Sequence, residues 1–198
     1  MRFLKIVSIA VFVLLISAPL VYAQDSDDSM KVTSPTSQNL NAITPGGMFD
    51  MSLAWAVGDS GTIIRWDGDQ SWELVSSPTT ANLYSVSMAS ASDAWAVGGA
   101  GNGDGAIIRW DGTNWDTWSG ITLGTSDSDQ IPTLYSVSML DSSFGWAVGE
   151  SGAILVWDGN EWAGSVDLAP GTLRSVAVVS TTDAWAVGDN GLIMRWTG

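Results

Sequence analysis

Five side chains with oxygen atoms fall in loops where they could bind a cation together. Two of these loops, at 99–104 and 119–133, are longer than their counterparts elsewhere in the chain. The side chains are Asn102, Asp104, Asp127, Asp129 and Glu150. A set of oxygen ligands in a glycine-rich loop suits Ca²⁺. The spacing lacks the Asp-x-Asp-x-Asp-Gly order of an EF-hand loop, so a solvated polar loop is the alternative.

Trp118 is the candidate for stacking against a sugar ring. Eleven of the twelve tryptophans occupy repeated positions, where core packing explains them, and Trp118 lies outside that pattern. An indole ring offers a flat apolar face to a carbohydrate. Trp118 and the five oxygen-bearing side chains therefore form the predicted ligand-binding set.

Catalysis is disfavoured by the residue types that the chain lacks. With no Cys and no His, it has no thiolate nucleophile, no Ser-His-Asp triad and no imidazole metal ligand. A sialidase needs converging arginines, but Arg65, Arg109 and Arg195 hold the same position of different repeats and must point apart. Two carboxylates could serve a glycosidase, although most acids fall at recurrent turns. The net charge of −14 disfavours a nucleic-acid partner.

The elements that must position these residues are four copies of one repeat. The tetrapeptide Trp-Ala-Val-Gly occurs four times, and each copy is followed by Gly-x-Ile-x-x-Trp. Three copies continue into Asp-Gly and a further Trp, and three are preceded by Leu-x-Ser-Val. The tetrapeptides span 55–58, 95–98, 146–149 and 185–188.

Each repeat predicts four short antiparallel strands. In the second copy three strands cover 83–88, 94–98 and 106–110, and a fourth begins at Trp115. These runs are rich in β-branched and aromatic residues and are bounded by Gly, Ser and Asp. Asp-Gly between the third and fourth strands is typical of a two-residue hairpin turn. Units of about forty residues with four strands indicate an all-β fold, a β-propeller.

A fourth strand for the last repeat is expected near the other end of the chain. Residues 32–40 match 75–83 at a constant offset of 43, which makes 30–33 a strand of the fourth type and 40–44 a degenerate first strand. Residues 30–198 then hold four whole units. The N-terminal strand would pair with the last blade and close the ring.

The first 23 residues have the form of a signal peptide. Arg2 and Lys5 precede an apolar stretch over 6–20, and Val21-Tyr22-Ala23 fits a cleavage site. We expect 1–23 to be removed, 24–29 to be a disordered leader and 30–198 to form the propeller. The mature protein, without a membrane span, is then secreted to the extracellular space or the cell surface, or periplasmic in a bacterium with two membranes.

The repeats resemble those of secreted prokaryotic β-propeller proteins. The pattern Ser/Thr-x-Asp-Ala-Trp-Ala-Val-Gly-x-x-Gly-x-Ile-x-Arg-Trp-Asp-Gly-x-x-Trp is similar to photosystem II assembly-factor-like repeats and to Asp-box (BNR, sialidase-like) repeats. The chain departs from a true Asp-box because Gly112 directly follows Asp111. It is also WD40/YVTN-like, without the Gly-His…Trp-Asp pattern of WD repeats. The resemblance implies the propeller fold rather than one function.

The two long loops indicate where the propeller binds its partner. Loops of these two kinds share one face of a propeller, and insertions on a rigid scaffold usually carry binding function. We predict an exported, non-enzymatic propeller that binds a protein or a glycan through the face of 99–104 and 119–133. Two alternatives stay open. One is a sialidase-like carbohydrate-active enzyme or lectin; the other is a structural module forming half of a two-chain larger propeller, so the expected state is a monomer or a two-chain ring.

Overall fold

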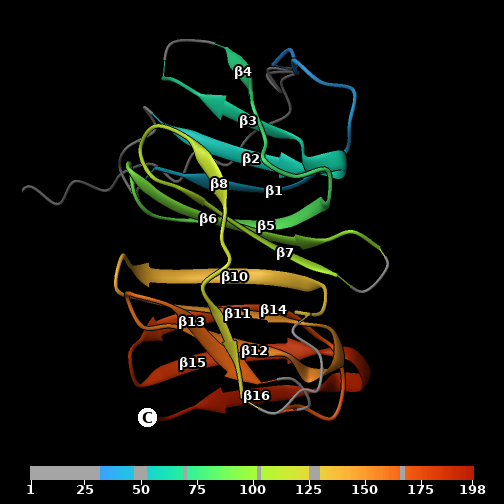
Figure 1. Cartoon of the computed structure of the whole chain (residues 1–198), viewed down its shortest axis with the longest axis vertical. Coiled ribbons are helices and arrows are strands. Elements are labelled where there is room, and N and C mark those ends of the chain that lie inside the picture. The colour runs from blue at the N-terminus through green and yellow to red at the C-terminus, as the bar shows by residue number, and fades with distance from the viewer. Residues whose placement is uncertain (1–31, 47–52, 69–70, 102–103, 125–129, 166–167) are drawn as a thin grey trace, which may run out of the picture. The chain divides into compact units, whose positions relative to one another are not determined.

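The computed structural model describes residues 32–46, 53–68, 71–101, 104–124, 130–165 and 168–198. These residues belong to one unit, Val32–Gly198, built from β-strands and short turns (Figure 1). The expected signal peptide at 1–23 and the leader at 24–29 lie outside the described residues. Within the described ranges, no helix is long and apolar enough to cross a membrane.

The strands form four sheets that succeed one another along the chain. Sheet 1 contains β1 (Leu40–Pro45), β2 (Ala54–Gly58), β3 (Ile63–Trp66) and β4 (Trp72–Val75). Sheet 2 contains β5 (Asn82–Ser90), β6 (Asp93–Gly99), β7 (Gly105–Trp110) and β8 (Trp115–Thr117). Sheet 3 contains β10 (Leu134–Asp141), β11 (Phe144–Gly149), β12 (Ile154–Trp157), β13 (Trp162–Ser165) and β9 (Ile121–Leu123). Sheet 4 contains β14 (Leu173–Ser180), β15 (Asp183–Gly188) and β16 (Ile193–Trp196).

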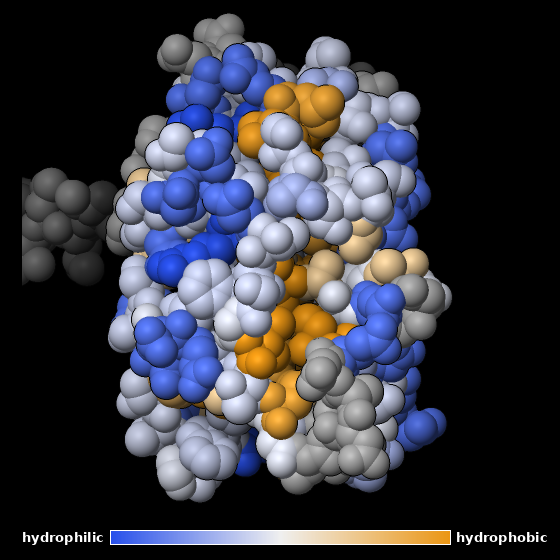
Figure 2. All heavy atoms as spheres, viewed as in Figure 1, coloured by the Kyte–Doolittle hydropathy of each residue, from blue (hydrophilic) through white to orange (hydrophobic). Residues whose placement is uncertain are grey.

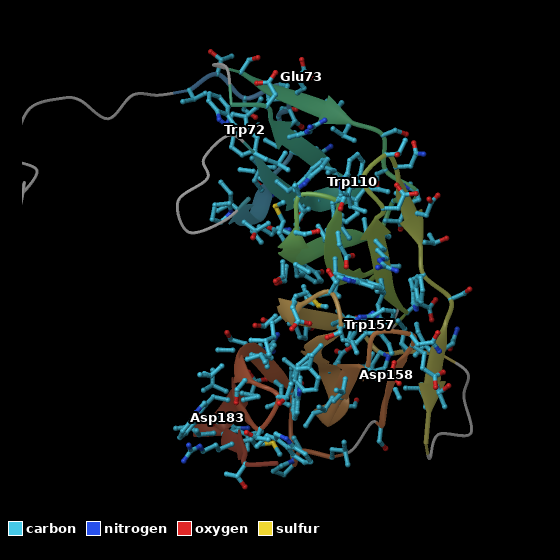
Figure 3. The ribbon with its side chains drawn as sticks, turned by 90° about the vertical axis from the view of Figure 1, so that its left-hand side faces the viewer. Trp72, Glu73, Trp110, Trp157, Asp158 and Asp183 are labelled. Atoms are coloured by element: carbon cyan, nitrogen blue, oxygen red, sulfur yellow. The ribbon has the colours of Figure 1, made fainter. Side chains whose placement is uncertain are left out.

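The repeated sequence therefore folds into a repeated sheet, as predicted. Within every sheet the first strand pairs with the second and the second with the third, always antiparallel. The first strands β1, β5, β10 and β14 are neighbours in succession. In Figure 3, Trp72 of sheet 1 and Asp183 of sheet 4 lie at opposite ends of this row, with Trp110 and Trp157 between them.

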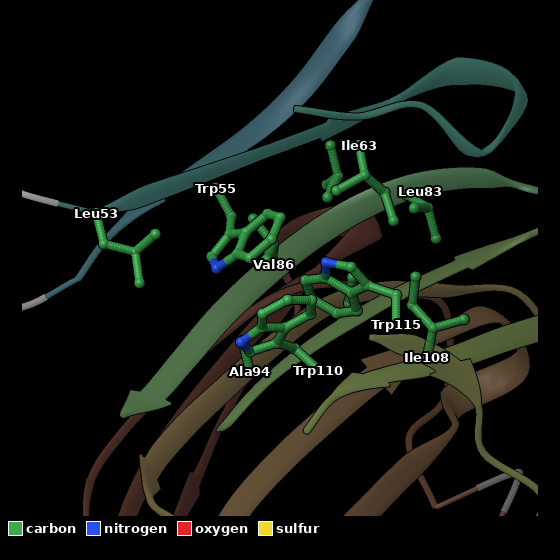
Figure 4. Packing of buried hydrophobic residues seen from close by; sticks show 11 residues of the cluster. Leu53, Trp55, Ile63, Leu83, Val86, Ala94, Ile108, Trp110 and Trp115 are labelled. Carbon is green, nitrogen blue, oxygen red and sulfur yellow. The ribbon is translucent and has the colours of Figure 1, made fainter. Parts of the chain in front are cut away.

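The core consists of apolar layers between successive sheets. Between sheets 1 and 2, the ring of Trp55 on β2 lies 4.8 Å from that of Trp110 and 5.2 Å from that of Trp115, centroid to centroid (Figure 4). All three tryptophans are buried. Each sheet is too thin to bury its own tryptophans, so stability depends on contact with the next sheet, as in other repeat architectures.

The Asp-Gly hairpins are longer than the two-residue turn that we predicted. Trp110 pairs with Trp115 across strands, which leaves a four-residue loop between them. The Asp111 carboxylate accepts hydrogen bonds from the backbone N–H groups of Thr113 and Asn114, at 2.7 and 2.8 Å. Gly112 takes a positive φ of 96°. The aspartate side chain thus builds the turn, and the loop needs four residues for that Asx geometry.

The second long loop forms a strand that the repeat pattern does not predict. Residues 121–123 form β9, which pairs parallel with β13 and makes sheet 3 five-stranded. The chain leaving sheet 2 therefore runs along the outer edge of sheet 3 before it enters β10. Alternating Ile121-Thr122-Leu123 suits an edge strand because its two apolar side chains can pack on one face.

The expected N-terminal closing strand is not formed by the described residues. Of the stretch 30–33, Met30 and Lys31 lie outside the described ranges, and Val32 and Thr33 are not in a strand. Val32 and Ser34 line a groove with Ile43 and Trp72 of sheet 1. The segment lies against sheet 1 because it leads directly into β1, whereas sheet 4 stands at the far end of the row. Sheet 4 therefore has three strands among the described residues.

An apolar cavity of about 370 Å³ opens where sheet 4 is narrower than the others. Trp146 of sheet 3 and Met194 and Trp196 of sheet 4 are among its lining residues. Hydrophobic side chains also reach the surface in a band across the sheets, between hydrophilic margins (Figure 2). The apolar layers are thus not fully sealed from solvent.

Candidate functional site

The two long loops meet at one end of the sheets. The backbone N–H of Gly105 donates to the carbonyl oxygen of Ile131 at 2.7 Å, and the N–H of Glu150 donates to the carbonyl oxygen of Thr133 at 2.8 Å. A Cβ atom on Gly99 would lie 2.6 Å from the Thr133 hydroxyl, so the strand end and the loop are in close contact. The described ends of the two long loops, at Gly99, Gly105 and 131–133, therefore lie together with the turn at Glu150.

The predicted cation ligands are only partly visible at this face. Asp104 and Glu150 are half-buried there, whereas Asn102, Asp127 and Asp129 lie outside the described residues. Among the described residues, no group of three or more acidic side chains is arranged to hold a metal ion. Calcium binding stays a prediction.

Trp118 lies in the apolar layer between sheets 2 and 3 rather than on an open loop. Its ring centroid is 5.2 Å from that of Trp95 and 5.3 Å from that of Trp157, and the Arg109 guanidinium carbon lies 5.6 Å from it. Its indole N–H donates to the carbonyl oxygen of Gly120 at 2.8 Å. The ring is half-buried because the turn into β9 folds it against the core, and sugar stacking by Trp118 stays a prediction.

The structure reveals a row of side chains that the sequence motifs alone do not single out. The first strand of every sheet carries a β-bulge near its start, at the residue that follows a leucine, where the register with the second strand shifts by one. The bulged residues are Asn41, Tyr84, Tyr135 and Arg174, which we call the bulge row. A bulge turns its side chain out of the regular alternation, and bulges commonly aim side chains at binding sites.

Three members of the bulge row contact one another across the sheets, and the fourth, Asn41, bonds to the backbone of the next sheet. The ring centroids of Tyr84 and Tyr135 are 5.5 Å apart, and the Arg174 guanidinium carbon lies 4.5 Å from the Tyr135 centroid. At the other end of the row, the Asn41 amide donates to the carbonyl oxygen of Leu83 at 2.9 Å. Four sheets thus contribute to one strip of aromatic and polar surface.

Acidic residues border this strip at the turns between second and third strands. In sheets 1, 3 and 4 these turns are the short 3₁₀ segments η1 (Asp59–Gly61), η2 (Glu150–Gly152) and η3 (Asp189–Gly191), and each begins with an acid. Their middle residues, Ser60, Ser151 and Asn190, take positive φ angles of 53–56°. Sheet 2 has the longer loop at 99–104 in this position. The predicted residue Glu150 therefore belongs to a border that the repeat itself generates.

Hydrogen bonds hold two of these acids in their charged form. The amides of Asn41 and Asn39 donate to the Asp59 carboxylate, which lowers the pKa of Asp59. Arg174 donates through Nε and Nη2 to the two oxygens of Asp189, at 2.9 and 3.0 Å. This pair lowers the pKa of Asp189 and raises that of Arg174. The strip therefore keeps fixed charges at neutral pH.

The described side chains of this face offer several kinds of contact. The two tyrosines offer ring faces and hydroxyls, Asn41 offers an amide, and the border offers carboxylates. The second position of Leu-x-Ser-Val holds Tyr in two copies and Arg in the third, so the sequence alone gives little sign of the row.

Comparisons with known proteins support the fold. No family model and no curated protein sequence matches the chain. Among solved structures it is similar to YCF48 bound to D1 peptide, with 20% identity, a TM-score of 0.59, and coverage of 83% of this chain and 52% of that one. It is also similar to YCF48 from Cyanidioschyzon merolae, with 21% identity, a TM-score of 0.59, and coverage of 83% and 55%.

Two further structures extend this likeness. The WD40 repeats of RRP9 give 10% identity and a TM-score of 0.67 over 85% of this chain and 51% of that one. The computationally designed Ika4 protein gives 12% identity and a TM-score of 0.60 over 84% and 96%. The chain thus has a propeller-like fold and spans about half the length of the YCF48 and RRP9 chains that it matches.

Proposed function

We propose that this chain is an exported, non-enzymatic propeller that binds a protein partner through the bulge row and the adjoining loops at 99–104 and 119–133. The observation that carries this proposal is the bulge repeated at one position of all four first strands. The four bulges place Asn41, two tyrosines and Arg174 along one strip, and bulges commonly aim side chains at binding sites.

The chemistry of the strip favours an extended peptide segment as the bound element. Tyr84 and Tyr135 supply ring faces of the kind that dominate protein interfaces. Arg174 is already paired with Asp189, so it does not offer a free charge to an acidic ligand. The net charge of −14 and the acidic border together favour a neutral or basic segment. One of the similar structures, YCF48 bound to D1 peptide, is a protein with a peptide ligand, which agrees with this mode.

A glycan is the weaker candidate ligand. Trp118 is the residue that we predict to stack on a sugar, and its half-buried ring is packed against Trp95 and Trp157, which leaves less of the ring open to a glycan. The structural alternative, half of a two-chain propeller, is favoured by a separate observation: Trp185 on sheet 4 is 42% exposed although its counterparts are buried.

Selection from a library of random peptides on the immobilised full chain tests the binding face. We expect enriched peptides to be neutral or basic and to bind at least tenfold more weakly to a Tyr84→Ala/Tyr135→Ala variant. The matched Tyr84→Phe/Tyr135→Phe variant keeps the ring faces and should lose less affinity. Equal binding to the parent and to the alanine variant, or a failure to enrich peptides, would contradict the proposal.

Export is tested by the N-terminal sequence of the protein recovered from an expressing bacterium. The basic and apolar character of 1–23 supports cleavage after Ala23. We expect the recovered chain to begin at Gln24 and to lie outside the cytoplasm. A cytoplasmic chain that still begins at Met1 would contradict export.

A further inference from the structure

The contact between successive sheets is built from the same residues each time. The tryptophan of the second strand in one sheet inserts against a tryptophan pair on the third and fourth strands of the next. Trp55 contacts Trp110 and Trp115 in this way, and Trp95 contacts Trp157 and Trp162 at 4.7 and 5.3 Å. Trp146 contacts Trp196 of the narrower sheet 4 at 5.8 Å. Every such junction therefore has an inserting side and a receiving side.

Sheet 4 presents an inserting side that is exposed. Trp185, Val187 and Ile193 are 42%, 44% and 66% exposed, while the equivalent side chains of sheets 1 to 3 are all buried. The guanidinium of Arg195 already lies over the Trp185 ring at 4.8 Å, as that of Arg109 lies over Trp95 at 5.0 Å. The exposed inserting side of sheet 4 thus has the same arginine-over-tryptophan arrangement as the buried inserting side of sheet 2.

Sheet 1 presents the matching receiving side. Its pair Trp66 and Trp72 has centroids 5.8 Å apart at 51°. The buried pairs have nearly the same geometry: 6.1 Å and 44° for Trp110–Trp115, and 5.7 Å and 45° for Trp157–Trp162. Ile43 on β1 is 64% exposed, whereas the equivalent Val86, Val137 and Val176 are buried. The receiving site is preformed beside the groove lined by Val32 and Ser34.

Hydrogen bonds between neighbouring first strands give an independent sign of fit. The Ser85 hydroxyl accepts from the N–H of Val137, and the Ser136 hydroxyl accepts from that of Val176, both at 3.2 Å. A second pair of bonds runs from Met139 N–H to Ser87 and from Val178 N–H to Ser138, at 3.0 and 3.1 Å. Sheets 2 and 3 thus each offer two hydroxyls that receive two N–H groups of the next sheet.

The free faces of sheets 4 and 1 match in this pattern as well. The first acceptor position of sheet 4 is Ser175, and the residue in line to donate on sheet 1 is Ile43. The second acceptor position is Ala177, which has no hydroxyl, and the residue in line on sheet 1 is Pro45, which has no N–H. The missing acceptor faces the missing donor, so no polar group would be left unpaired.

We propose that sheet 4 of one copy of this chain docks on sheet 1 of a second copy, and that two copies close into one ring through two such junctions. The second copy carries the Trp66–Trp72 pair, the Ile43 N–H and Pro45 that this face fits. A two-fold ring of identical head-to-tail contacts is a closed symmetric assembly. This inference is independent of the binding proposed at the bulge row.

Light scattering of the full chain after size separation tests the assembly. We expect the mass of two chains, and that of one chain for Trp185→Ser, with a dissociation constant raised at least 100-fold and an unchanged circular dichroism spectrum. The matched control is Val179→Ser. Val179 is exposed, and so is the equivalent Leu140 in sheet 3, which has neighbours on both sides; this variant should keep the two-chain mass. A one-chain mass for the unmodified protein, a larger assembly, or a two-chain form that survives Trp185→Ser would overturn the proposal.

Mixing two variants tests the head-to-tail polarity. Ile43→Asp places a charge on the receiving side and Ile193→Asp places one on the inserting side, both at exposed positions that the single chain should tolerate. Each variant should be a single chain on its own. An equal mixture should form a two-chain species, because it retains one intact junction. Self-association of either variant, or no association in the mixture, would contradict the polarity.

Discussion

The junction between sheets 2 and 3 and the outward face of sheet 4 use the same residues with different results. Trp95 is fully buried among Trp157, Trp162 and Trp118, whereas Trp185, at the same position of its repeat, is 42% exposed. Both indole rings have an arginine above them. The difference shows that a sheet does not bury its own tryptophan; the next sheet does. The repeat itself thus sets the orientation of the indole ring, and the neighbouring sheet buries it.

Replacing the two tryptophans should give the largest difference. We expect Trp95→Ala to lower the free energy of unfolding by about 3–5 kcal/mol, because it leaves a cavity among packed rings. Trp185→Ala should lower it by about 1 kcal/mol or less at protein concentrations where the chain is single, since that ring has little packing to lose. Urea unfolding followed at low protein concentration measures both. Equal losses would show that sheet 4 buries its ring in solution.

Two glycines at the same turn position should differ by a smaller amount. Gly152 and Gly191 have φ angles of +68° and +76°, so alanine is strained at either, by about 1–2 kcal/mol. A Cβ on Gly152 would also lie 2.2 Å from the carbonyl oxygen of Ala169, whereas nothing lies within 4 Å of one on Gly191. We expect Gly152→Ala to destabilise the chain by about 1–3 kcal/mol more than Gly191→Ala. Thermal unfolding of the two variants measures this difference. Equal melting temperatures would mean that the backbone at Ala169 moves aside without cost.

The smallest expected difference concerns the serine hydroxyls between first strands. Ser138→Ala removes the acceptor of the Val178 N–H and should cost about 1 kcal/mol. Ser175→Ala should cost nothing in the single chain, but it should weaken the two-chain form several-fold. Unfolding below and above the concentration of assembly separates these effects. A Ser175→Ala variant that is unaffected at high concentration would remove the hydroxyl from the proposed junction.

Most of the strands could be predicted from the repeat, because each obeys a local pattern and recurs. Trp-Ala-Val-Gly and the Ile-x-x-Trp strand fall where expected in every copy, and the fold follows from their succession. The strand β9 could not be predicted, because three residues carry too little periodicity and the pairing partner, β13, comes later in the chain. We predicted the pairing of 30–33 with the last sheet from the match between 32–40 and 75–83. That match indicates the type of strand but not which sheet edge lies near the N-terminal segment.

The candidate site was harder to predict than the fold. Glu150 directly follows a repeated Trp-Ala-Val-Gly, and Asp104 lies in a loop lengthened by an insertion, so both positions could be read from the sequence, while ligand binding by them stays a prediction. Sugar stacking by Trp118 stays a prediction, but the packing of its ring against Trp95 and Trp157 could not be predicted, because that contact joins two sheets. The bulge row escaped notice because a bulge is a matter of register between two strands, and register depends on the strand pair and not on either strand alone.

Pro45 has a consequence for the order in which the sheets can stand. A first strand with proline at this position forms no bond to a hydroxyl on the strand before it, so it fits best behind a strand that offers none. The corresponding residues are Thr44, Ser87, Ser138 and Ala177, and Ala177 is the one among them without a hydroxyl. Sheet 1 is therefore suited to follow sheet 4, and a shuffled chain that placed Pro45 after Ser87 or Ser138 would waste a hydrogen bond. Pro45 and Ala177 thus favour one order of the sheets, in which sheet 1 follows sheet 4.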